Sequence, residues 1–137
     1  MRAWTPAWEH WYRRALPAYW LFLFLSTHLP QLTLPGAGSD KITHIVGFGL
    51  LALLFWKFCE SFARPLPDWF VLATAVVLAT YAALDEWTQQ YVGRGADWRD
   101  WLADMVGIGL VLAGLEWRRR AAETAARSSR SDAGGTL

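Results

Sequence analysis

Residues 98–117 read WRDWLADMVGIGLVLAGLEW. The longest uncharged run in this stretch, 105–115, is about half of the roughly 20 apolar residues that a membrane-spanning helix needs. A spanning helix must therefore carry Asp104 into the hydrocarbon and place Asp100 near its edge. Because a carboxylate at that depth costs on the order of 2.5–3.5 kcal/mol on insertion scales, it usually faces a protein interior and serves a function.

The apolar residues of the chain are gathered in four long blocks. Hydrophobic residues make up 54% and charged residues 18% of the 137 residues, less charge than the roughly 25% of an ordinary soluble domain. None of the blocks alternates with the period of two that marks a strand. We therefore predict an all-α, polytopic membrane protein, a bundle of four transmembrane helices. The predicted spans are 16–29, 42–58, 69–84 and 98–117.

Two short segments flank this four-helix membrane domain, which we place at 15–117. Residues 1–14 carry Trp4, Trp8 and Trp11 at helical spacing, a pattern typical of an amphipathic helix in the membrane interface. Residues 118–137 begin with three arginines and are otherwise polar, so we predict a basic, disordered cytoplasmic tail. Glycines in the second and fourth spans predict close helix packing: Gly47, Gly49, Gly107, Gly109 and Gly114.

The basic residues are distributed unevenly along the chain. With the N-terminus inside, ten Lys and Arg residues fall on the cytoplasmic side and only three, Lys41, Arg94 and Arg99, fall outside. This positive-inside bias predicts a multi-pass protein of the bacterial cytoplasmic membrane with both termini in the cytoplasm. Cys59 is the only cysteine, which excludes an intramolecular disulfide and a paired-cysteine metal site.

Polar residues of three predicted helices meet at the outer side of this topology. Asp97, Asp100 and Asp104 follow at i, i+3 and i+7 and share one helical face. We expect Lys41 or His44 to approach Glu86, and Arg94 to pair with Asp97 or Asp100. The predicted ligand-binding residues are Asp40, Lys41, His44, Asp85, Glu86, Gln89, Arg94, Asp97, Asp100 and Asp104; no metal ligand, catalytic residue or cofactor is assigned.

A purely structural role is the alternative for these residues. Ion pairs between helices would hold the bundle together, although buried pairs often add little net stability. Three positive groups stand against six acids in the predicted site, so an excess of carboxylate remains. A cation, protons or a ligand would have to balance that excess.

Several of these residues also form a pattern known from one protein family. Asp40-Lys-Ile-Thr-His44, Glu86-Trp-Thr-Gln89, Gly93-Arg94, Asp97, Asp100 and Gly107 occur in this order, and together they resemble the signature of the VanZ-like family of small bacterial membrane proteins. The family is named for a member associated with low-level resistance to teicoplanin-type glycopeptides, so the resemblance implies a role in the cell envelope or in antibiotic resistance. At Asp104 the chain departs from the family, which commonly has Asn there.

Three functions fit these observations. The first is a binding protein whose outward-facing acidic pocket holds an envelope precursor, a lipid headgroup or a glycopeptide-related ligand. The alternatives are an enzyme acting on a lipid-linked glycan or phosphate, and a small ion- or proton-coupled transporter. The expected partners are the lipid bilayer, a lipid-linked precursor or anionic headgroup and a second copy of the chain, but no nucleic acid.

Overall fold

The computed structural model describes residues 9–29, 37–62 and 64–134, without the side chains of residues 9, 37–40 and 131–134. These residues form α1 (Glu9–His28), α2 (Ala37–Glu60), α3 (Phe70–Gln89), the 3-10 helix η1 (Gln90–Val92) and α4 (Trp98–Gly134). No strand occurs in this part of the chain, which confirms the all-α prediction.

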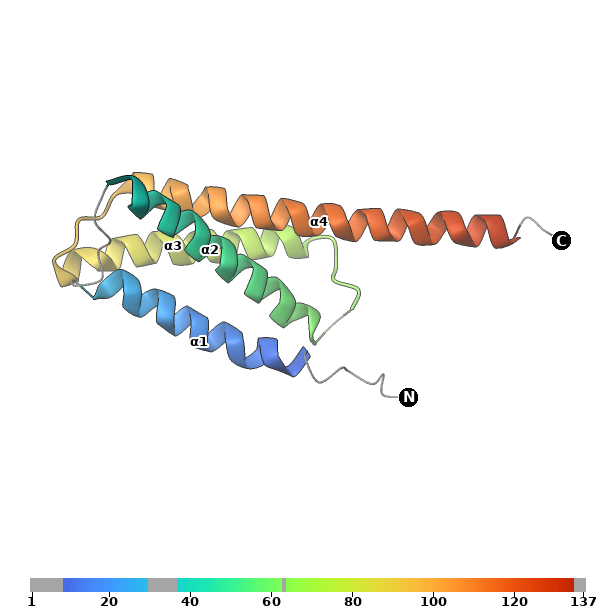
Figure 1. Ribbon diagram of the computed structural model, residues 1–137, viewed down its shortest axis with the longest axis horizontal. Coiled ribbons are helices and arrows are strands. Elements are labelled where there is room, and N and C mark those ends of the chain that lie inside the picture. Colours follow the sequence, from blue (N-terminus) through green and yellow to red (C-terminus); the bar gives the residue numbers. More distant parts are fainter. Residues whose placement is uncertain (1–8, 30–36, 63, 135–137) are drawn as a thin grey trace.

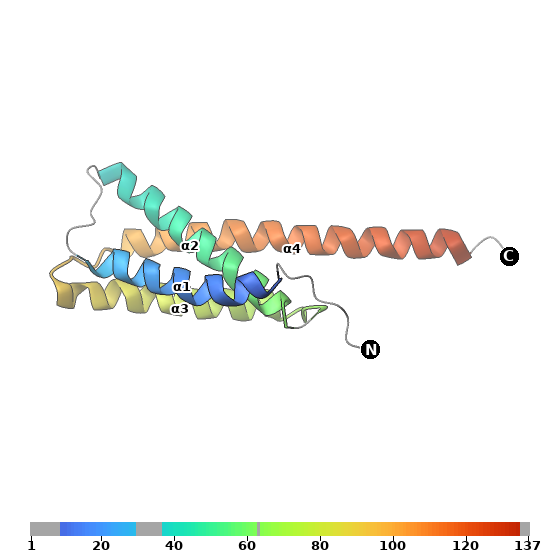
Figure 2. The same cartoon turned by 60° about the horizontal axis from the view of Figure 1, so that its bottom comes forward.

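The four α-helices form an elongated bundle that α2 crosses obliquely (Figures 1 and 2). The most extensive helix pair is α2 with α4, followed by α3 with α4 and α1 with α2. Figure 1 shows α1 ending, α2 beginning and α3 turning into α4 at the same end of the bundle. The connection from α2 to α3 and the long extension of α4 lie toward the other end.

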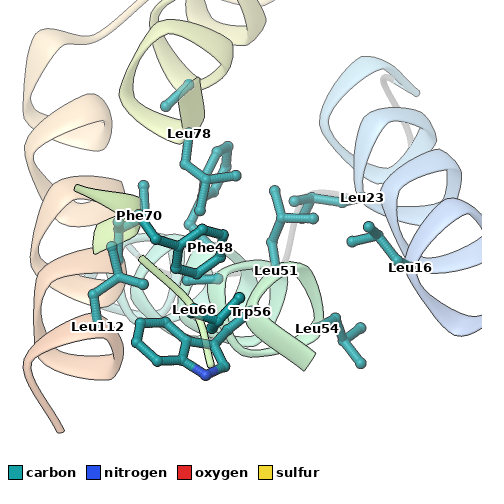
Figure 3. Packing of buried hydrophobic residues seen from close by; sticks show 13 residues of the cluster. Leu16, Leu23, Phe48, Leu51, Leu54, Trp56, Leu66, Phe70, Leu78 and Leu112 are labelled. Carbon is teal, nitrogen blue, oxygen red and sulfur yellow. The ribbon is translucent and has the colours of Figure 1, made fainter. Parts of the chain in front are cut away.

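The apolar core is built around α2. Phe48 and Leu51 are completely buried, and Leu78 of α3 and Leu112 of α4 belong to the same cluster. Figure 3 shows Leu23 of α1 close to Leu51, so α1 closes the other side of this core. Burial of such side chains contributes about 1.5–3 kcal/mol each in water, but in a bilayer packing and polar contacts carry more of the association.

Close contact between α2 and α4 depends on Gly107, which faces Ile45 and Gly49. A Cβ atom on Gly107 would lie 2.1 Å from the backbone oxygen of Ile45, and one on Gly49 would lie 3.4 Å from the backbone oxygen of Gly107. Only a hydrogen atom fits at Gly107, whereas a Cβ atom on Gly49 would make an ordinary van der Waals contact. The predicted small-residue packing is therefore confirmed at Gly49 and Gly107, whereas a Cβ atom on Gly109 or Gly114 would meet nothing within 4 Å.

The outside of the bundle is apolar while several ionisable side chains are inside. Ile42, Leu72 and Leu110 each expose more than half of their surface, whereas Asp85 and Asp104 are almost completely buried. Within the described residues, two segments are long and apolar enough to cross a membrane, Lys41–Glu60 and Phe70–Val92. This inside-out distribution is typical of a membrane protein.

The structure differs from the sequence expectation in the C-terminal flanking segment and leaves the N-terminal one untested. Most of the predicted interfacial segment lies outside the described residues, and residues 9–14 belong to α1. Where a disordered tail was expected from residue 118, α4 continues as helix to Gly134. The segment is rich in alanine and arginine, which favour helix, and Arg119 pairs with Glu123 one turn later.

Candidate functional site

The polar residues singled out above lie at one end of the bundle, where α1 and α3 end and α2 and α4 begin (Figure 1). Gly93 follows η1 in the left-handed conformation, with φ of 79°, and allows the chain to turn back toward α4. We call seven of these residues the polar cluster, because their side chains contact one another between α2, α3 and α4; they are Lys41, His44, Asp85, Glu86, Gln89, Asp100 and Asp104.

The centre of the polar cluster is a contact between α2 and α4. His44 Nδ1 and Asp104 Oδ1 lie 2.9 Å apart, and both side chains are more than nine-tenths buried. The second oxygen of the carboxyl group, Asp104 Oδ2, is buried and has no hydrogen-bond partner among the described residues. An unpaired carboxylate oxygen in such a place is costly, so this atom requires a partner.

A second carboxylate of α4 connects this centre to the edge of the bundle. Lys41 Nζ donates a hydrogen bond of 2.8 Å to Asp100 Oδ1, and Asp100 Oδ2 lies 3.9 Å from His44 Nε2. The Lys41 side chain is 43% exposed and the Asp100 side chain 14% exposed. Lys41 therefore occupies the rim of the polar cluster, while His44 and Asp104 form its floor.

Glu86 enters the polar cluster from α3. Its Oε2 accepts a hydrogen bond of 3.1 Å from the backbone N–H of Asp97, and Gln89 Nε2 donates to Oε1 over 3.4 Å. One ligand atom each from His44, Glu86 and Asp104 lies within 4.8 Å of the other two. The expected approach of His44 to Glu86 is present, whereas Lys41 pairs with Asp100 instead.

Asp85, next to Glu86 in sequence, faces α1. Thr27 Oγ1 donates a hydrogen bond of 3.1 Å to Asp85 Oδ1, and Gln89 Nε2 donates one of 3.1 Å to Asp85 Oδ2. His28 Nδ1 is 3.8 Å from Asp85 Oδ1, and its Nε2 is 2.9 Å from Thr88 Oγ1. Sequence reasoning missed the contacts that α1 makes here; the available signal was a pair of polar residues, Thr27 and His28, at the C-terminal end of an apolar helix.

The prediction for Arg94 is wrong. Its Nη1 donates hydrogen bonds to the backbone oxygens of Ser26, at 3.2 Å, and Thr27, at 2.9 Å, and it makes no ion pair with Asp97 or Asp100. The last carbonyls of a helix lack partners within the helix and carry partial negative charge, so a cation is stabilised there. Arg94 thus caps the end of α1.

Asp97 lies outside the buried floor as well. Its Oδ1 accepts a hydrogen bond of 2.9 Å from the backbone N–H of Arg99, the contact of an N-cap residue at the start of α4. Asp40 is part of the backbone of α2, but its side chain lies outside the described residues. The structure therefore brings seven of the ten predicted site residues into the polar cluster.

Acidic groups outnumber cationic groups in the polar cluster. Its carboxyl groups are those of Asp85, Glu86, Asp100 and Asp104, and the described cation among them is Lys41. His44 adds a positive charge only if it is protonated. Such a site can attract a cation, or accept hydrogen bonds from hydroxyl or amino groups of a ligand.

Charged residues gather in a different way at the opposite end of the bundle. Arg119 pairs with Glu116 at 2.7 Å and with Asp68 at 3.1 Å, and the hydrogen bond with Glu116 raises the pKa of Arg119 above its ordinary value. Arg13 donates hydrogen bonds to the side chain and backbone of Ser61. Each acid named here is paired with an arginine, whereas the polar cluster has more carboxyl groups than cations.

Comparison with known proteins gives one match. The sequence profile of the family described as VanZ/LLP1 matches residues 4–117, which include every residue of the polar cluster. No curated protein and no solved structure matches the chain.

Proposed function

The chain belongs to the VanZ/LLP1 family, and we propose that it is a multi-pass membrane protein whose polar cluster binds the headgroup of an envelope lipid or lipid-linked precursor. The observation that carries this proposal is the buried surplus of carboxylate, above all the unpartnered Oδ2 of Asp104. An ion-pair network that only held the helices together would pair each of its charges, because an uncompensated buried charge costs several kcal/mol.

The proposed topology has four membrane spans. Two segments, Lys41–Glu60 and Phe70–Val92, meet the criteria of length and apolarity, and α1 and the first part of α4 run alongside them. Exposed apolar side chains on the outside of the bundle support lipid contact, as with Phe22 of α1 and Leu110 of α4. The acidic residues of α4 lower its apparent hydropathy, yet they face the interior, where a membrane helix tolerates them.

The proposed orientation places the polar cluster at the outer face of the membrane. Arg13, Lys57 and Arg119 lie at the end of the bundle opposite to the polar cluster. Cytoplasmic ends of membrane helices are enriched in Lys and Arg, which favours that end as the inside. The polar cluster then faces the compartment in which envelope precursors are used.

The chemistry of the polar cluster suits a headgroup that carries both phosphate and hydroxyl or amino groups. Lys41 at the rim can donate to a phosphate, and the carboxylates of Glu86 and Asp104 can accept from hydroxyl or amino groups. Trp87 and Trp98 are more than half exposed at this end, where aromatic side chains favour the membrane interface and can stack on sugars. A glycopeptide-related role would follow if the bound precursor is one that such antibiotics recognise.

Native mass spectrometry of the full-length protein extracted in mild detergent tests the proposal. Two lysines of α2 form a matched pair, because Lys41 bonds to Asp100 and Lys57 bonds to Glu60, each at 2.8 Å. We expect a phosphorus-containing lipid adduct on the wild type and on Lys57→Gln, and at least about tenfold less of it on Lys41→Gln, since a charged hydrogen bond contributes about 1.5–3 kcal/mol. No adduct on the wild type, or equal adducts on both variants, would overturn the proposal.

A further inference from the structure

We infer that His44, Glu86 and Asp104 form a binding site for a divalent transition-metal ion of the zinc type. The inference deepens the proposed function and rests on the polar cluster being a binding site. Each of the three helices α2, α3 and α4 supplies one ligand, and the three ligand atoms lie within 4.8 Å of one another. All three side chains are more than nine-tenths buried.

The spacing of these atoms is close to that of ligands on one ion. Zinc binds nitrogen and oxygen at about 2.0–2.2 Å, so two ligands on one zinc ion lie roughly 3.4 Å apart. His44 Nδ1 and Asp104 Oδ1 are already 2.9 Å apart, and an ion could replace the proton that they share. A separation at the 4.8 Å limit would have to shorten by about 1.4 Å, which the Glu86 side chain can provide by rotation about its flexible bonds.

The unpartnered Oδ2 of Asp104 is an independent indication of a ligand. The side chain is 1% exposed, so bulk water does not solvate this atom. In a native structure such an orphaned polar atom indicates an ion or water that completes its coordination. Asp104 lies near His44 of α2 and Glu86 of α3. A cation bound among them would pair with Oδ2 and would also offset the surplus of carboxylates over cations.

The charge and type of the ligands select the class of ion. A neutral imidazole with two carboxylates carries two negative charges, which one divalent cation balances. Imidazole favours zinc and other transition metals, whereas magnesium and calcium prefer a shell made of oxygen alone. The backbone N–H of Asp97 and the amide of Gln89 hold the Glu86 carboxylate, as outer partners of metal ligands commonly do.

The inferred ion gives the headgroup proposal a specific chemistry. Three protein ligands leave a fourth zinc position open, which a phosphate oxygen can take. Lys41 lies at the rim of the same polar cluster and can donate to the same phosphate. The ion would also offset the negative charge of Glu86 and Asp104, which favours an anionic headgroup.

Metal titration of the full-length protein in detergent tests this inference. The protein is stripped with a chelator, desalted and titrated with Zn²⁺, and bound metal is counted by elemental analysis. Visible absorption after loading with Co²⁺ reports a nitrogen-and-oxygen coordination shell independently. The isosteric variants are Asp104→Asn and Glu86→Gln, and the matched control is Glu116→Gln, a buried carboxylate at the opposite end of the bundle that pairs with Arg119.

We expect one Zn²⁺ per wild-type chain and per Glu116→Gln chain, with millimolar Mg²⁺ unable to displace it. Each of the other two variants should bind at least about tenfold more weakly, because even outer partners of metal ligands contribute a factor of 10–100. The inference would be overturned if the wild type bound no stoichiometric Zn²⁺. It would also be overturned if Asp104→Asn and Glu86→Gln bound Zn²⁺ with the same affinity as the wild type. A variant that elutes as aggregate is replaced by His44→Asn, judged by the same criterion.

The two proposals fail in different ways. A phosphorus-containing lipid adduct without zinc would overturn the metal site and leave the headgroup proposal standing. Bound zinc without a lipid adduct would overturn the headgroup proposal and leave the metal site standing.

Discussion

Replacement of Gly107 by alanine tests the contact that aligns the two halves of the polar cluster. Gly107 lies in α4 three residues after Asp104, and the oxygen that a new Cβ atom would meet belongs to Ile45, next to His44 in α2. The substitution should push α4 away from α2 at the level of the His44–Asp104 contact. It should therefore lower stability and disturb the polar cluster together.

The size of the effect follows from the geometry. The new Cβ atom would lie 2.1 Å from the Ile45 oxygen and 3.0 Å from the Gly49 nitrogen, while ordinary contact begins at 3.4 Å. The helices must separate by about 1.3 Å at this point, because the opposing atoms are backbone. Overpacking of this kind costs about 1–3 kcal/mol, here toward the upper end, so the melting temperature should fall on the order of 5–10 °C.

Thermal melting in detergent measures this effect, with Gly109→Ala as the control. Gly109 lies on the same helix two residues later, and a Cβ atom there would meet nothing within 4 Å. Alanine at this position should leave stability unchanged or raise it by up to about 1 kcal/mol through helix propensity. Equal melting of Gly107→Ala and wild type would refute the close packing of α2 and α4.

Three further predictions concern topology and the helix ends. In a Cys59→Ser background, an impermeant maleimide should label a cysteine at Gly95 but not one at Arg130 in intact cells, and the reverse pattern would invert the proposed orientation. Arg94→Ala should destabilise the protein by about 1–2 kcal/mol in thermal melts through loss of the bonds to the last carbonyls of α1, whereas unchanged melting would mean that this cap is unimportant. Asp97→Ala should lower stability by about 1 kcal/mol and Asp97→Asn by less, since asparagine also caps; equal losses would argue against the N-cap assignment.

The sequence was sufficient to predict that residues of α2, α3 and α4 would come together, seven of the ten predicted ones. Helical spacing put Asp100 and Asp104 on one face, and the cost of a carboxylate in hydrocarbon required that face to be internal. The order of the motifs carried the resemblance to the VanZ-like family, which the profile match confirms. The membrane setting is supported by two helices of sufficient length and apolarity.

The partner of each residue could not be predicted in the same way. Arg94 bonds to helix-end carbonyls because these backbone groups, which every helix has, compete with carboxylates for a cation. Asp85 faces Thr27 and not His44, since adjacent positions on a helix point in directions about 100° apart. The three residues of the inferred metal site lie on three helices and are up to 60 positions apart, so no local spacing reveals them.

The continuation of α4 was missed for a related reason. Polar composition alone favours disorder, but alanine and arginine have high helix propensity and the preceding span already supplies a nucleus. Helix formation beyond Trp117 then requires only propagation, assisted by the pairing of Arg119 with Glu116 and Glu123.

Glu86→Gln distinguishes a polar cluster that binds a ligand from one that only holds the helices together through ion pairs. Glutamine keeps an acceptor for the Asp97 N–H while it removes one of the surplus charges. Melting temperature and native mass should be measured on the same detergent preparation. We expect the variant to lose the lipid adduct and, compared with wild-type protein stripped of lipid and metal, to melt at an equal or higher temperature, because bound ligands would themselves stabilise the wild type. A drop equivalent to about 3–5 kcal/mol with the adduct retained would identify a structural ion-pair network and contradict ligand binding by the polar cluster.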